Sequence, residues 1–167
     1  MSYLGIDIGS SCVKAVAFQA DGKRLAMARR GYEFLSPTPG AMELDSTRVL
    51  TAACGVIAEV AAQTVADPIR ALAISSQGEA ITPVDRTGRP LANAMISGDS
   101  RAADAMMRFT EKFGAQKLYR ITGHTPSAMF SLAKLLWLAE QRPQVRRQHP
   151  RRNLRRRETK GKTACTH

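Results

Sequence analysis

Aromatic residues, cysteines and long apolar runs are all scarce in this sequence of 167 residues, of which 5% are aromatic. The three cysteines are an odd number and form no Cys-x-x-Cys pair, which excludes a disulfide framework and the usual zinc spacings. No apolar run approaches the ~20 residues that a membrane span needs. The N-terminus has no cationic segment, and Asp7 interrupts its short apolar run, which excludes a typical signal peptide. We therefore expect a cytoplasmic protein with reduced cysteines and no membrane partner.

Acidic residues are scarce only towards the C-terminus. The chain carries 25 Lys and Arg against 14 Asp and Glu, a net charge of +11. From Arg142 onward there are ten basic residues and one acid, whereas the preceding part has 15 basic and 13 acidic residues. A chain that is basic throughout is typical of nucleic-acid binding. This uneven distribution indicates instead a nearly neutral body, long enough for one hydrophobic core, followed by a basic tail.

The N-terminal residues predict three antiparallel strands. Residues 3–9, 12–18 and 24–32 are apolar or alternate between apolar and polar side chains. Gly9-Ser10-Ser11 forms a tight turn between the first two, and Asp21-Gly22 marks the second turn. We therefore expect a meander in which each strand pairs with the next.

A helix and a parallel strand are expected to follow. Asp45 is a good N-cap, and apolar residues recur at helical spacing to about residue 65. Asp67-Pro68 ends that helix, and residues 69–75 predict a buried strand. A helix between two strands implies a right-handed crossover, so this strand is expected to pair in parallel with an earlier one.

The second half of the chain predicts a hairpin and two helices. Residues 81–84 and 91–96 flank an Asp-Arg-Thr-Gly turn. Residues 101–113 have helical periodicity, and a last helix is expected to begin at Ser127 and to end at Pro143.

The turn at residues 9–11 carries the first chemical signal. Asp7 is a carboxylate at the end of a strand, and the amides and hydroxyls of the turn can bind phosphate oxygens. The carboxylate can hold Mg²⁺ through water, and Lys14 adds positive charge. The turn matches neither a P-loop nor the Gly-x-Gly-x-x-Gly pattern. An ordinary hairpin with a turn aspartate stays the alternative on these residues alone.

Five segments in order resemble the N-terminal part of the FGGY carbohydrate kinases, the group of xylulose, glycerol and gluconate kinases. The resemblance covers roughly residues 3–145. Its segments are Asp7, Gly9, Ser10 and Lys14 in the first phosphate motif, then residues 39–45, residues 74–79, Asp99-Ser100-Arg101, and Ile121-Thr122-Gly123 with Lys134-Leu135-Leu136-Trp137-Leu138.

The resemblance implies an α/β fold of the ribonuclease H-like, actin-like ATPase type, truncated, with a mixed sheet and helices on both faces. It implies ATP and Mg²⁺ as cofactors and transfer of the γ-phosphoryl group to a sugar or polyol hydroxyl. The residues it assigns to the phosphates are Asp7, Gly9, Ser10, Ser11 and Lys14, with Asp7 holding Mg²⁺ through water. The residues it assigns to the sugar are Gln77, Glu79, Asp99 and Arg101.

Some positions depart from the family's patterns. Gly78 stands where glycerol kinases have arginine, no Met-His pair follows Gln77 as in xylulose kinases, and Ser97 stands where tryptophan is common. The resemblance therefore does not assign the sugar. It also places the general-base aspartate and the adenosine-binding domain beyond residue 167, so we expect no catalytic residue in this chain and no activity of the chain alone.

We expect two regions: the kinase part at residues 1–145 and a basic tail at residues 146–167. The tail departs from the family, and we expect that a frameshift or premature end produced it and that it is disordered. A plain solvated tail is the next alternative, and a nucleic-acid-binding arm is the least favoured, because the tail has no aromatic residue for base stacking. A non-catalytic, sugar-responsive module of the same superfamily, and a homodimeric parent enzyme, also stay open.

Overall fold

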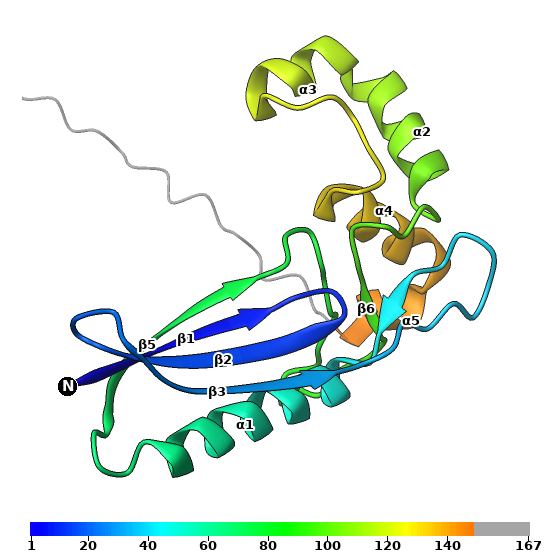
Figure 1. Ribbon diagram of the computed structural model, residues 1–167. Coiled ribbons are helices and arrows are strands. Elements are labelled where there is room, and N and C mark those ends of the chain that lie inside the picture. The colour runs from blue at the N-terminus through cyan, green and yellow to red at the C-terminus, as the bar shows by residue number, and fades with distance from the viewer. Residues whose placement is uncertain (149–167) are drawn as a thin grey trace, which may run out of the picture.

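The computed structural model describes residues 1–148 and begins with a three-stranded antiparallel meander (Figure 1). The strands are β1 (Ser2–Ile8), β2 (Cys12–Gln19) and β3 (Arg24–Gly31). Alternation along β2 buries Val13, Ala15 and Ala17 and leaves Lys14 exposed, as expected for a sheet with one covered face. The predicted meander is confirmed.

Helix α1 (Ser46–Gln63) and strand β5 (Ile69–Ser76) form the predicted crossover. The carboxylate of Asp45 accepts hydrogen bonds from the amides of Thr47 and Arg48, at 2.8 and 3.2 Å, and so caps the helix. β5 pairs in parallel with β1, which gives the strand order β3-β2-β1-β5. The prediction of a capped helix followed by a parallel strand is confirmed.

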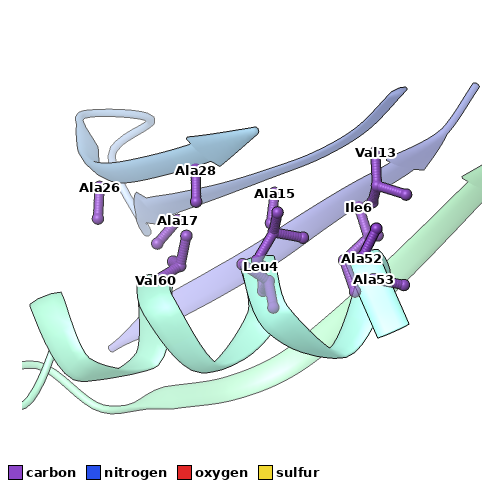
Figure 2. Packing of buried hydrophobic residues seen from close by; sticks show 11 residues of the cluster. Leu4, Ile6, Val13, Ala15, Ala17, Ala26, Ala28, Ala52, Ala53 and Val60 are labelled. Carbon is purple, nitrogen blue, oxygen red and sulfur yellow. The ribbon is translucent and has the colours of Figure 1, made fainter. Parts of the chain in front are cut away.

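The main core lies between α1 and the sheet (Figure 2). Most of its members are alanine or valine, and such small side chains allow the helix to lie close to the strands. The buried residues of this cluster are Leu4, Ile6, Val13, Ala15, Ala17, Ala26, Ala28, Ala52, Ala53, Val56 and Val60.

The prediction that residues 69–75 are buried is wrong. Leu72 and Ile74 pair in register with the buried Leu4 and Ile6, so they lie on the face that α1 covers. They are nevertheless 55% and 59% exposed, because α1 packs mainly over β2 and β3, at the opposite side of the sheet from β5. Sequence periodicity indicates a strand but not which of its neighbours cover it.

The opposite face of the sheet also departs from the prediction of helices on both faces. Tyr3, Phe18 and Met27 lie on that face and are 45%, 38% and 52% exposed. Within residues 1–148, no helix packs against it. Asp7 and Lys14 pair with each other across β1 and β2, so both lie on this open face.

A small antiparallel pair links the sheet to the helical part. It consists of β4 (Glu43–Leu44) and β6 (Ala94–Met95). Isolated bridges join Ile81 to Met95 and Val84 to Pro90, and the carboxylate of Asp85 accepts the amides of Thr87 and Arg89 in the connecting turn. The predicted hairpin is confirmed, although its pairing is limited to single bridges.

Four helices complete the described chain: α2 (Ala103–Phe113), α3 (Ala115–Thr122), α4 (Ser131–Gln141) and α5 (Pro143–Gln148). Buried Ala102, Met106, Leu118 and Ala133 form a second core among α2, α3 and α4, away from the sheet (Figure 1). None of the described helices has the length and hydropathy needed to cross a membrane.

Three sequence predictions need correction in this region. The helix α3 is absent from the prediction, which assigned no regular structure to its eight residues after Gly114. α4 begins at Ser131 and not at Ser127, whose hydroxyl accepts the amide of Met129 in a turn. Pro143 begins α5 instead of only ending α4, since proline is favoured in the first turn of a helix. α5 thus crosses the expected boundary at residue 145, and the expectations for the tail from residue 149 lie outside the described residues.

Candidate functional site

The turn between β1 and β2 is anchored by the residue that follows β3. The amide of Gly9 donates to the carbonyl of Cys12, and the amide of Tyr32 donates to the carbonyl of Ser11, both at 3.0 Å. The hydroxyl of Tyr32 donates to the carbonyl of Gly9. A Cβ atom at Gly9 would lie 3.2 Å from the carbonyl oxygen of Cys12, so only glycine fits without a shift of the backbone.

This anchoring sets the direction of the Ser10 amide. The carbonyl and the amide of one trans peptide point in opposite directions. Because the Gly9 carbonyl points at Tyr32, the N–H of Ser10 points away from that side chain, as a phosphate-binding turn requires. Burial raises the pKa of Tyr32, and the nearby Cys12 and Asp7 raise it further, so the hydroxyl stays protonated and donates. Sequence analysis did not identify Tyr32 as a residue of this turn. The structure pairs Gly31 with Cys12 and so places Tyr32 beside the turn, which the predicted pairing of residues 24–32 with residues 12–18 could have indicated.

The donor set around Asp7 fits magnesium only in part. Mg²⁺ is commonly held by one or two carboxylates, with waters and phosphate oxygens as its other ligands. Within residues 1–148, no group of three or more potential metal-ligating side chains comes together. Asp7 would therefore be a single carboxylate ligand, acting through water, and phosphate would supply the rest.

Gln77 continues the pairing of β5 with β1 and leaves a buried atom unused. Its amide donates to the carbonyl of Ile8 at 2.9 Å. Its side-chain oxygen Oε1 is buried without a hydrogen-bond partner, and Gln77 lines a pocket of about 280 Å³ with Ser76 and Ala80. Since an unsatisfied buried acceptor is costly, a donor that reached this oxygen would be stabilised.

Glu79 lies in an unusual turn held by helix α4. Its φ angle is 60°. Its Oε2 atom accepts the amide and the hydroxyl of Ser131, at 2.6 and 2.8 Å, and the Nζ of Lys134 donates to its backbone carbonyl. The two hydrogen bonds from Ser131 lower the pKa of Glu79, with smaller contributions from Lys134 and His124. Glu79 therefore stays ionised at neutral pH.

Asp99 and Arg101 form a buried ion-pair network. The Asp99 carboxylate, whose residue is 1% exposed, accepts the amide of Met42 at 3.0 Å and the Nη2 of Arg101 at 2.6 Å. The same Nη2 donates to Glu43 at 2.6 Å, and the guanidinium lies over the ring of Trp137. Burial alone would raise the pKa of Asp99, but the hydrogen bonds from Arg101 and Met42 outweigh it and lower the pKa.

The segments singled out in the sequence thus meet around α4. Glu79 contacts Ser131 and Lys134 at the start of the helix, and Arg101 contacts Trp137 further along it. The structure brings Gln77 and Glu79 to the end of β5. It also joins Asp99 to Arg101, and the polar atoms of both side chains are hydrogen-bonded to other protein groups. Asp7 and Lys14 lie at the turn between β1 and β2, on the open face of the sheet.

The sequence profile of the FGGY family of carbohydrate kinases, N-terminal domain, matches residues 2–151. The chain belongs to this family. It is 32% identical over 143 residues to the probable L-xylulose kinase of Haemophilus influenzae, covering 84% of this chain and 30% of that protein. It is also 32% identical over 150 residues to the glycerol kinase of Methylibium petroleiphilum, covering 87% and 30% of the two chains.

The fold agrees with that of solved FGGY kinases. The ligand-bound xylulose kinase from Lactobacillus acidophilus superposes with a TM-score of 0.80 at 26% identity, over 86% of this chain and 29% of that one. The fold is thus that of sugar kinases of the actin-like ATPase type, as the resemblance predicted. The chain spans about 30% of the length of the curated relatives it matches.

Proposed function

We propose that this chain is the phosphate- and sugar-binding part of an ATP-dependent carbohydrate kinase that acts on a sugar or polyol hydroxyl in the cytoplasm. The observation that carries the proposal is the anchored turn after β1. There the Ser10 amide points away from its Tyr32 anchor, close to the exposed Asp7 and Lys14. An anion-binding turn next to a single carboxylate suits a magnesium-bound phosphate chain.

At this turn the chain would position phosphate. The amides of Ser10 and Ser11, with their hydroxyls, donate to phosphate oxygens, and Gly9 permits the close turn. Lys14 supplies positive charge on the same face as Asp7. Magnesium, when bound, neutralises charge that develops on the transferred group. Asp7 would orient that ion through water.

Past the end of β5, Gln77 and Glu79 line two separate pockets, and we propose both as contacts of the sugar. A carboxylate accepts hydrogen bonds from neutral hydroxyls with charge-assisted strength, and Gln77 has a free buried acceptor. Asp99 and Arg101 also belong to our proposed sugar site. Because their polar atoms are hydrogen-bonded within the protein, we assign them to holding its wall in place.

We also propose that residues 1–145 form the kinase part and that this chain alone does not catalyse phosphorylation of a sugar or polyol. The resemblance places the general base outside this chain, and the chain spans about 30% of its relatives. Binding can therefore be tested separately from catalysis.

A titration of the ¹⁵N-labelled chain with MgATP, followed by NMR, tests the phosphate role. We expect the largest shifts at residues 9–11 and about ten-fold weaker binding in Lys14→Met, which removes one charge-assisted contact. Lys23→Met is the matched control, because Lys23 is an exposed lysine in the turn at the far end of β2. Equal losses in both variants, or shifts that avoid the turn, would contradict the proposal.

A further inference from the structure

Glu79 is the one non-glycine residue with a left-handed backbone among residues 1–148. A side chain at this φ is sterically disfavoured, and glutamate lacks the short polar side chain that helps asparagine and aspartate to adopt it. Such a conformation persists only where the surrounding structure holds it, and it is enriched at functional sites. The contacts of Glu79 therefore need a physical explanation.

Two residues from the first turn of α4 hold Glu79 from both ends. Ser131 binds the carboxylate through its amide and hydroxyl, and Lys134 binds the backbone carbonyl. All three hydrogen bonds span more than 50 residues of sequence, so they join β5 to α4 directly. The carboxylate and the peptide of Glu79 are thus fixed independently.

Burying the charged amine of Lys134 costs free energy, which indicates that the amine makes specific contacts. Its side chain is 0% exposed, and burial lowers its pKa, although Glu79 and Asp99 oppose that shift. Its Nζ donates to the carbonyl of Met129 at 2.5 Å as well as to that of Glu79. An apolar side chain could fill the same space beside Ala133 without desolvating a charge.

We propose that Lys134 is a positioning residue of the sugar site: it holds the left-handed turn at Glu79 and so keeps the carboxylate on Ser131. Only Oε2 of Glu79 is hydrogen-bonded within residues 1–148, which leaves Oε1 for a ligand. Glu79 lines a cavity of about 220 Å³ together with His124, Phe130 and Ser131. That volume lies below the ~300–1,000 Å³ typical of pockets for drug-sized ligands and suits a small polyol.

The ligand in this inference rests on the proposed function, but the positioning itself does not. The bland alternative is that Lys134 only stabilises α4 through the Met129 carbonyl. Both interpretations predict a lower free energy of unfolding when the lysine is replaced, so a stability measurement cannot separate them. The hydrogen bond between Ser131 and Glu79 separates them, because only the positioning role predicts that this bond is lost.

The test follows the Ser131 amide proton by NMR in the 167-residue chain during an acid titration. In the wild type this resonance should move as Glu79 is protonated, because its amide donates to that carboxylate. Lys134→Met should abolish the movement, and Lys117→Met, an exposed lysine on α3, should preserve it. A Lys134→Met protein that keeps the wild-type response overturns the inference.

A second variant covers the case in which Lys134→Met does not fold. Lys134→Gln keeps an N–H donor without the charge and should retain the Ser131 response, whereas Lys134→Leu, which has no donor, should lose it. A folded Lys134→Leu protein that keeps the response would contradict the positioning role.

Titration with glycerol and with L-xylulose then tests the ligand. We expect shifts at the Glu79 carboxyl carbon in the wild type and about ten-fold weaker binding in Lys134→Met. Equal affinity of the two proteins overturns the inference. No shift in the wild type with either glycerol or L-xylulose contradicts the proposed sugar site, while the Ser131 response still decides the positioning role.

Discussion

The guanidinium of Arg101 lies over the indole ring of Trp137, with its central carbon 4.6 Å from the ring centroid. The same group donates to Asp99 and to Glu43, so one side chain joins the loop before α2 to β4 and to α4. A cation desolvated over tryptophan contributes about 2 kcal/mol or more, beyond its ion pairs. These three segments are distant in sequence, and we therefore expect them to unfold cooperatively.

Replacing Arg101 with methionine should destabilise the protein strongly. The substitution leaves Asp99, whose side chain is 0% exposed, as a buried charge without its partner, and such losses cost about 3–5 kcal/mol. Arg108→Met is the matched control, since Arg108 and its partner Glu140 are 51% and 41% exposed and an exposed pair contributes about 1 kcal/mol or less. Urea unfolding measures both. Similar losses in the two variants would contradict a buried network.

The stability of the protein should fall in acid, in part through Asp99. Its pKa lies below the ordinary value of about 3.9, so the group contributes stability above that pH and loses it as the pH falls through the lowered folded pKa. The free energy of unfolding should therefore decline below about pH 4, and less steeply in Asp99→Asn. Asp104→Asn, an exposed acid on α2, serves as the control in urea titrations across this range. An unchanged slope in Asp99→Asn would count against the assignment.

Local patterns predicted the first half of the fold well. The alternation in β2, the Asp45 cap and the crossover to β5 all depend on residues close in sequence. The exposure of Leu72 and Ile74 could not be predicted in this way, because it depends on where α1 lies over the sheet. The short helix α3 was missed for another reason: its eight residues are shorter than the ~11-residue window over which helical periodicity is recognised.

The candidate site was predicted by residue type more than by role. The motif resemblance singled out Glu79, Asp99 and Arg101. It did not indicate that Asp99 accepts a hydrogen bond from the amide of Met42, 57 residues away. The sequence also does not indicate that Lys134 is buried. Lysine is rarely buried unless it has a partner, and the partner here, the carbonyl of Glu79, lies 55 residues earlier in the sequence. Contacts of such separation follow from the packing of α4 against the end of β5, which no local pattern specifies.

The purified chain should show no sugar-dependent release of ADP. The resemblance places the general base elsewhere, and loss of such a base alone lowers rates by about 10²–10⁴-fold. A coupled assay with pentoses, hexoses and polyols measures the turnover. The glycerol kinase of Methylibium petroleiphilum, as a relative of this chain, provides the positive control with glycerol. A rate near ~1 s⁻¹, within the ordinary enzyme range, would show that the prediction is wrong.

Removing the hydroxyl of Tyr32 should weaken phosphate binding more than it weakens the fold. Tyr32→Phe keeps the ring in the core and deletes only the hydrogen bond to the Gly9 carbonyl, a loss of about 0.5–1.5 kcal/mol in stability. Without that bond the peptide between Gly9 and Ser10 can rotate, so the Ser10 amide is no longer held in place before phosphate arrives, and ordering it then opposes binding. We therefore expect faster hydrogen exchange at Ser10 and several-fold weaker binding of MgATP. Tyr3→Phe, which removes the hydroxyl of an exposed tyrosine on β1, should change neither property. If Tyr32→Phe binds MgATP as the wild type does, the anchor contributes to folding and not to the phosphate site.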